Sequence, residues 1–154
     1  DSAHHAVLWV SQWPRSQVYP GFLAPILLSS GIRRAVTVLY DPVRSDQAAR
    51  DIRKKKTEYI SDQGQRQRIG QIEDASQSAE YADVLQQEAD LTAGHGVLRY
   101  TGLIAISAPS VDELDAAVAA IEQAAIQASC ETRLLVGQQA QAFVAAALPL
   151  GRGL

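Results

Sequence analysis

The chain has 154 residues, of which 47% are hydrophobic and 20% are charged, and these values are typical of one folded domain rather than a disordered segment. The formal net charge of −3 lacks the basic excess expected of a general nucleic-acid binder. No apolar run approaches the roughly 18 residues of a membrane-spanning helix, and a single cysteine, Cys130, excludes an internal disulfide and favours a reducing compartment.

Three elements are expected in the first 40 residues. Residues 7–13 predict a strand, because apolar and aromatic residues dominate this segment and a proline follows it. Residues 22–30 predict a short helix that ends at a glycine. Residues 32–40 predict a second strand with alternate residues apolar, and Asp41 and Pro42 are expected to close it.

Residues 45–93 predict a long helical region that Ser45 caps. The region is polar, and its apolar residues are few and mostly small. From Ile69 onward they recur every three or four residues, a spacing typical of one face of a helix. They are Ile69, Ile72, Ala75, Ala79, Ala82 and Leu85. With a break at Gly64 or Gly70, this thin stripe predicts two helices that pack on each other and project from the sheet as a hairpin.

The clearest strand is expected at residues 97–108, after the segment Gly94-His95-Gly96 has ended the helical region as a C-cap and turn. Apolar and polar residues alternate along it and predict one buried face. That face would carry Leu98, Tyr100, Ile104 and Ile106. Gly102 interrupts the pattern and predicts either a bulge or a close approach of another group to the backbone.

The last third of the chain predicts a helix, a strand and a second helix. Ser110 and Glu113 have the Ser-x-x-Glu spacing of a capping box and stand at the start of a strongly amphipathic helix. Residues 131–136 predict the fourth strand, and residues 138–147 predict the last helix.

These elements predict a fold of the α/β class (α+β). Their order is β-α-β, a helical region, and then β-α-β-α, which without the helical region is the ferredoxin-like split βαβ order. Such a fold has a four-stranded antiparallel sheet with two helices on one face. We therefore expect residues 1–154 to form a single domain, with residues 45–93 as a long helical-hairpin insert between strands 2 and 3.

No complete catalytic or metal-binding motif stands out in the sequence. A phosphate-binding loop needs Gly-x-x-x-x-Gly-Lys-Ser/Thr, and no lysine follows a glycine here. His4 and His5 are expected in a frayed N-terminus, far in sequence from His95, so the histidines do not predict a metal site. Cys130 follows an alanine-rich helix and is expected to be a small packed residue rather than a nucleophile.

A basic run at Arg53, Lys54, Lys55 and Lys56 is the candidate interaction site. Such a run could contact nucleic acid or acidic lipid. The surrounding residues 44–90 contain ten acidic and eight basic residues, which favours a solvated helix face over a nucleic-acid site.

Trp9 and Trp13 are four residues apart, so they are expected on the same face of the first strand. Aromatic residues on a ferredoxin-like sheet can stack on bases, as in the RNA-recognition motif. That motif needs a glycine- and aromatic-rich pattern on the third strand, which residues 98–104 do not match. We therefore predict that the two tryptophans pack in the core or at a domain interface.

Six short segments together suggest a family: LWVSQWPR at residues 8–15, GFLAP at 21–25, GIRR at 31–34, EQAA at 122–125, GQQ at 137–139 and LPLGRGL at 148–154. They resemble the region that precedes the motor domain in actinobacterial TraC-type ATPases of conjugation and type IV secretion. The resemblance spans nearly the whole chain, but none of these segments carries catalytic residues.

The resemblance implies a hexameric ATPase at the cytoplasmic face of the inner membrane, with ATP and Mg²⁺ bound by a motor domain that follows this region. It implies no cofactor and no catalytic or metal-binding residue within the chain itself. Because the chain contains no methionine, it is expected to be a fragment of a larger protein, and residues 148–154 would lead into the next domain. The expected partners are other subunits of a secretion complex, with a homo-oligomer as one arrangement.

The leading hypothesis is therefore a non-catalytic assembly domain of a conjugative-transfer ATPase. One alternative is a ferredoxin-like small-molecule-binding or sensory domain, for which Trp9, Arg99 and Tyr100 would be the residues to suspect. A second alternative is a nucleic-acid-contacting module that uses the basic run.

Overall fold

The computed structural model describes residues 3–69 and 75–148. The chain divides into two compact units, Asp1–Leu39 with Tyr100–Leu154, here called the sheet unit, and Tyr40–Arg99, here called the helical unit. The helical unit contains α2 (Ser45–Ile69) and α3 (Ala75–Thr92).

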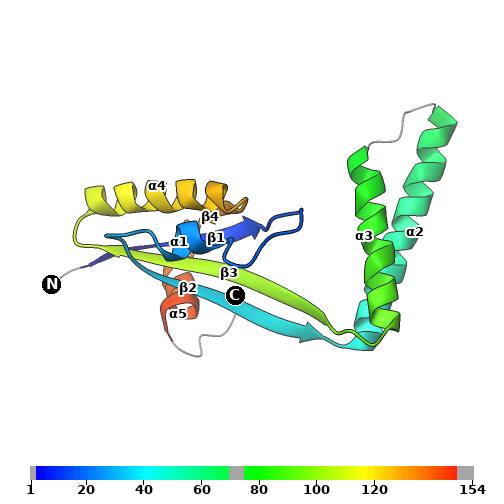
Figure 1. The fold of residues 1–154 in the computed structure, drawn as a ribbon, viewed down its shortest axis with the longest axis horizontal. Coiled ribbons are helices and arrows are strands. Elements are labelled where there is room, and N and C mark those ends of the chain that lie inside the picture. The colour runs from blue at the N-terminus through cyan, green and yellow to red at the C-terminus, as the bar shows by residue number, and fades with distance from the viewer. Residues whose placement is uncertain (1–2, 70–74, 149–154) are drawn as a thin grey trace. The chain divides into compact units, whose positions relative to one another are not determined.

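The sheet has four strands in the order β2-β3-β1-β4 (Figure 1). They are β1 (His4–Gln12), β2 (Arg33–Val43), β3 (Val97–Ala108) and β4 (Glu131–Leu134). Strand β1 pairs antiparallel with both β3 and β4. The helices of the sheet unit are α1 (Ala24–Leu27), α4 (Val111–Gln127) and α5 (Gln139–Ala147). The predicted mixed α/β class with a four-stranded antiparallel sheet is confirmed.

Helices cover both faces of the sheet. On one face, α1 and α4 pack over Leu8, Val10, Ile104 and Ile106. On the other face, three alanines of α5, Ala142, Ala145 and Ala146, pack over Val7, Leu103 and Ala105. The prediction that β3 has a single buried face is therefore wrong. In its central part α5 covers the side that was expected to face solvent (Figure 1), and Leu98 and Tyr100 of the predicted buried face are exposed.

Gly102 allows a close approach of an aromatic ring to β3. A Cβ atom at this position would lie 2.6 Å from Cζ2 of Trp13 and 3.0 Å from Cγ2 of Val10. The same indole meets the ring of Tyr100 edge-on, with centroids 5.3 Å apart. The glycine thus leaves the space that the Trp13 ring occupies. Of the two predicted alternatives, a bulge and a close approach of another group to the backbone, the structure has the close approach.

Trp9 and Trp13 lie on opposite faces of the sheet, contrary to prediction. Trp9 shares the face of Val7, whereas Trp13 packs against the core on the face of α4. The pairing of β1 with β4 shifts register between Val10 and Gln12, and such an irregularity reverses the alternation of side chains that the prediction assumed.

The N-terminus is not frayed at the histidines. His5 pairs with Ser107 in the β1–β3 ladder, and its Nδ1 lies 2.8 Å from the Ser107 hydroxyl. Its ring also contacts Phe143 of α5, with centroids 4.6 Å apart. These contacts overturn the expectation of a disordered end at His4 and His5.

Strand β2 continues through Asp41 and Pro42 to Val43, beyond its predicted end. Because β2 is the edge strand of the sheet, a proline can occupy it without removing a hydrogen bond from a central ladder. The helix predicted at residues 22–30 is shorter, Ala24–Leu27, and the fourth strand ends at Leu134.

Helix ends follow local chemistry closely. Ser110 accepts a hydrogen bond from the Glu113 amide at 3.3 Å and caps α4 as predicted. At the other end of α4, Ser129 adopts a left-handed φ of 57°. The amide of Cys130 then bonds the carbonyl of Ala125, which is a Schellman-type ending. Cys130 is buried, as predicted, and burial raises the pKa of its thiol.

Gly94 ends α3 by the same motif. Its φ is +90°, its amide bonds the Leu91 carbonyl, and the amide of His95 bonds the Asp90 carbonyl. The predicted turn at Gly94-His95-Gly96 is therefore confirmed. Gly64 lies inside α2 and does not break it, whereas Gly70 lies outside the described residues.

Candidate functional site

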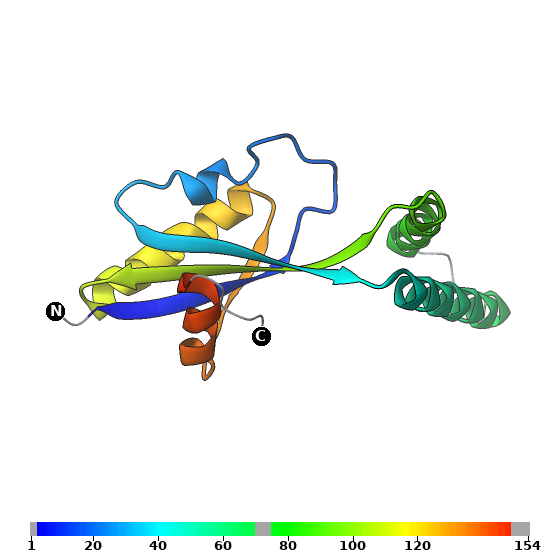
Figure 2. The same cartoon turned by 90° about the horizontal axis from the view of Figure 1, so that it is seen from below.

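Helices α2 and α3 run antiparallel, side by side, within the helical unit (Figures 1 and 2). Three pairs of side chains join them in reversed order along the chain: Lys56 with Glu88, Tyr59 with Tyr81, and Arg66 with Gln77. As the residue number rises in one helix it falls in the other, which fixes the antiparallel direction.

The residues that face between the two helices follow a heptad pattern. Their spacing alternates between four and three residues, the repeat of a coiled coil. On α2 they are Ile52, Lys56, Tyr59, Gln63 and Arg66, and on α3 they are Gln77, Tyr81, Val84, Glu88 and Leu91. We call these ten residues the seam. Ile52 is buried and the others are half-buried.

The seam is unusually polar for a coiled coil. Nζ of Lys56 donates a hydrogen bond to Oε2 of Glu88 at 2.7 Å. That hydrogen bond raises the pKa of Lys56, against the opposing effect of desolvation. The rings of Tyr59 and Tyr81 stack with centroids 4.2 Å apart and planes 8° apart. Polar seam positions specify the register of paired helices at a cost in stability.

The apolar stripe predicted from the sequence is not the packed face. Ala75, Ala79, Ala82 and Leu85 are all exposed, and α3 has no buried residue among those described. The stripe's other members, Ile69 and Ile72, have side chains outside the described part of the chain. The helical period was predicted correctly but the face was wrong, because Tyr81, Val84 and Glu88 occupy the seam instead.

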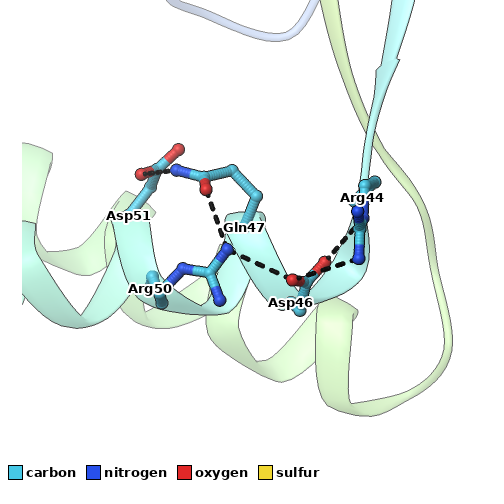
Figure 3. Close-up of polar contacts among 5 residues, drawn as sticks. All are labelled: Arg44, Asp46, Gln47, Arg50 and Asp51. Carbon is cyan, nitrogen blue, oxygen red and sulfur yellow. Dashed lines mark hydrogen bonds and ion pairs between the residues drawn. The ribbon is translucent and has the colours of Figure 1, made fainter.

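At the start of α2, two arginines hold one carboxylate (Figure 3). Nε of Arg44 and Nη2 of Arg50 each lie 3.1 Å from an oxygen of Asp46. Partial desolvation opposes ionisation of Asp46, but the hydrogen bonds and charge of the arginines, together with the Gln47 amide, lower its pKa below the ordinary value. A carboxylate in the first turn of a helix also complements the helix dipole.

The carbonyl of Arg44 accepts the first helical hydrogen bond, from Ala48 at 2.9 Å. Ser45 is therefore the first residue inside α2 and not its cap, so the predicted cap is displaced by one residue. The side chain of Gln47 donates to Asp51, whose carboxylate also lies 3.3 Å from Nη2 of Arg99 (Figure 3 shows the first of these contacts).

The basic run does not form one continuous patch. Four consecutive helical residues point in four directions, because each residue turns the helix by about 100°. Lys56 lies in the seam with Glu88, Lys54 lies 3.8 Å from Glu58, and Arg53 and Lys55 are exposed on different sides. Contact of the run with nucleic acid stays an untested alternative to the solvated helix face that the sequence favours.

A groove of about 510 Å³ opens along one side of the seam. Beyond seam residues, it is lined by residues that immediately precede a seam position: Lys55, Glu58, Asp62, Glu80, Asp83 and Gln87. The lining carries four carboxylates against two cationic side chains, Lys55 and Arg66. This acidic groove was not expected from the sequence, although the heptad spacing on α2 was a signal that could have located it.

The opposite side of the seam carries mostly small and apolar residues and one cation, Arg53. They immediately follow seam positions and are all exposed: Arg53, Thr57, Ile60 and Gly64 on α2, and Ser78, Ala82, Leu85 and Ala89 on α3. We call these eight residues the strip. Ile60 is 57% exposed and Leu85 is 41% exposed, and the strip contains no acidic residue.

The three residues suspected of binding a small molecule are not brought together. Tyr100 packs with Trp13, whereas Arg99 pairs with Asp51 in the helical unit. Trp9 lies on the face opposite Trp13. The helices that fill both sheet faces do not favour a ligand site there.

Within residues 3–69 and 75–148, no group of three or more His, Cys, Asp or Glu side chains is arranged to hold a metal ion. No helix in this part of the chain combines the length and apolarity that a membrane span requires.

No family model matches the chain, and no curated protein matches it.

Proposed function

We propose that this chain is a non-catalytic assembly domain of a conjugative-transfer (type IV secretion) ATPase, in which α2 and α3 form the interaction arm. The observation that carries the proposal is the exposure of Ile60 and Leu85 beside a seam in which five of the ten residues are charged or amide side chains. Helices in proteins are usually stabilised by burying an apolar face, and here two large aliphatic side chains lie outside the packed face.

Burial of the exposed apolar side chains of the strip would favour binding of a partner. Full burial of an isoleucine or leucine side chain contributes about 1.5–3 kcal/mol relative to exposure. In the described part of the helical unit only Ala48 and Ile52 are buried. A partner that covered the strip would supply the apolar burial that the two helices do not provide for each other.

The sheet unit supports the finer proposal of a ferredoxin-like split βαβ fold. The elements β1-α1-β2 and β3-α4-β4 carry the two halves, and the strand order β2-β3-β1-β4 fits that topology. Helices α1 and α4 cover the same face, and α5 is an addition on the other. In this proposal α2 and α3 are an insert between strands β2 and β3.

The family assignment and its consequences belong to the same proposal. The resemblance of residues 8–15 and 148–154 to TraC-type ATPases supports a larger protein that binds ATP and Mg²⁺ in another domain. It also supports a place at the cytoplasmic face of the membrane, among other subunits of a secretion complex.

Site-specific photocrosslinking in the full-length protein tests the proposal. A crosslinking amino acid at position 86, on the exposed surface of α3, should capture another subunit in the native host. The same amino acid at position 126, exposed on α4, is the matched control. Capture from position 126 but not from position 86 would contradict the proposal.

A further inference from the structure

The two sides of the helical pair differ in charge and shape. An α-helix turns about 100° per residue, so residues that follow the seam lie on one side and residues that precede it lie on the other. In an antiparallel pair, the residues that follow seam positions lie on the same side of the pair in both helices. The groove lining agrees with this geometry, because outside the seam it contains only residues that precede a seam position.

We propose that a second copy of this chain docks its strip into the acidic groove of the first. This inference deepens the proposed function, on which it rests, by naming the partner of the interaction arm. Ile60 and Leu85 would be the apolar residues that enter the groove, whose floor includes Tyr59, Tyr81 and Val84.

Charge complementarity supports a second copy as the occupant. Arg53 lies on the strip and has no ion-pair partner among the described residues. Asp62, Glu80 and Asp83 line the groove and likewise have no ion pair in the described part of the chain. Docking would bring the cation of one copy to the groove of the next, whose four carboxylates outnumber its two cations.

Small residues on the strip permit close contact between the helices of the two copies. Gly64, Ala82 and Ala89 have small side chains or none, so the groove of one copy can approach the helix backbone of the other. The strip and the groove lie on opposite sides of one helical pair, so the contact is heterologous. A heterologous contact generates a ring if the rotation closes and an open stack if it does not.

Complementation of two broken surfaces tests this inference directly. One variant breaks the strip by Arg53→Glu with Leu85→Glu, and the other breaks the groove by Asp62→Lys with Glu80→Lys. Each should remain a monomer in analytical ultracentrifugation, whereas the unmodified chain should gain mass with concentration. An equimolar mixture should form a 1:1 heterodimer, because one intact strip and one intact groove remain, and salt should weaken it.

The control is Ile126→Glu, which places a charge at an exposed apolar position of α4 and should self-associate like the unmodified chain. Circular dichroism must show unchanged helix content for each variant used. Loss of association in the strip variant but not in the groove variant would indicate an isologous contact and overturn the proposal. A mixture without heterodimer, or an unmodified chain that stays monomeric at every concentration, would also overturn it.

Failure of this inference is distinguishable from failure of the proposed function. A monomeric chain whose position 86 still captures a different subunit in the host would exclude self-docking and leave the interaction arm in place. Absence of any capture from position 86, together with a chain that stays monomeric at every concentration, would remove both.

Discussion

The ring of Tyr59 lies nearly parallel to that of Tyr81, with centroids 4.2 Å apart, and joins the middle of α2 to the middle of α3. Aromatic pairs of this kind contribute about 0.5–1.5 kcal/mol beyond the area they bury. Because only three of the ten seam residues are aliphatic, this contact is expected to be a main determinant of how the two helices pair.

Replacement of Tyr81 by alanine should therefore loosen the helical unit without disturbing the sheet unit. The expected result is faster hydrogen exchange along α2 and α3, measured by mass spectrometry, with β1 and β3 unchanged. Tyr81→Phe keeps the ring and should behave like the unmodified chain. Equal exchange in the alanine and phenylalanine variants would show that the stacking does not hold the pair.

The Lys56–Glu88 contact predicts a dependence of the helical unit on alkaline pH. The hydrogen bond to Glu88 raises the pKa of Lys56 above its ordinary value of 10.5. Its stabilisation is therefore fully present below the unfolded pKa and is lost as pH rises through the higher folded pKa. Thermal melting followed by circular dichroism should show a fall in stability above about pH 10.5 that Lys56→Gln reduces. The same alkaline fall in both proteins would refute the assignment.

Gly102→Ala should destabilise the sheet unit by about 1–3 kcal/mol, the usual effect of overpacking. The new Cβ would lie 2.6 Å from the Trp13 ring, so the indole must move. Tryptophan fluorescence during urea unfolding measures the change. Gly96→Ala is the control, since nothing lies within 4 Å of a Cβ there. Unchanged stability of the Gly102 variant would mean that the indole is free to relocate.

Ser129→Gly should stabilise the chain by about 1 kcal/mol, because Ser129 has a left-handed φ of 57° that glycine adopts without steric strain. Ser129→Ala keeps a Cβ atom and should bring no such gain. Urea denaturation compares the three proteins. A glycine variant no more stable than the alanine variant would indicate that the turn is not strained.

Several elements could be predicted from sequence because local chemistry determines them. The cap at Ser110 and the turn at Gly94 depend on neighbouring residues only, and the structure has both. The bounds of β3 were also predicted correctly, from the alternation of its residues. The mixed α/β class also follows from the order of the patterns.

Other features depend on contacts that the sequence pattern does not contain. Trp13 lies on the face opposite to the predicted one because the strand pairing shifts register between Val10 and Gln12. The alternation of residues along the sequence cannot reveal such a shift. The seam was missed because Lys56, Glu88 and the two stacked tyrosines do not register as an apolar stripe, whereas the exposed alanines of α3 do. Hydrophobic periodicity identified the helices but not the faces on which they pair.

Hydrogen exchange in the isolated and the assembled protein tests the interaction arm most directly. In the isolated chain, amides of α2 and α3 should exchange much faster than those of β3, because few buried residues hold the helices. In the full-length protein in its assembled state, α2 and α3 should become protected while the sheet unit stays as it was. Protection confined to the sheet unit, or equal protection of helices and sheet in a monomeric chain, would contradict the role proposed for these helices.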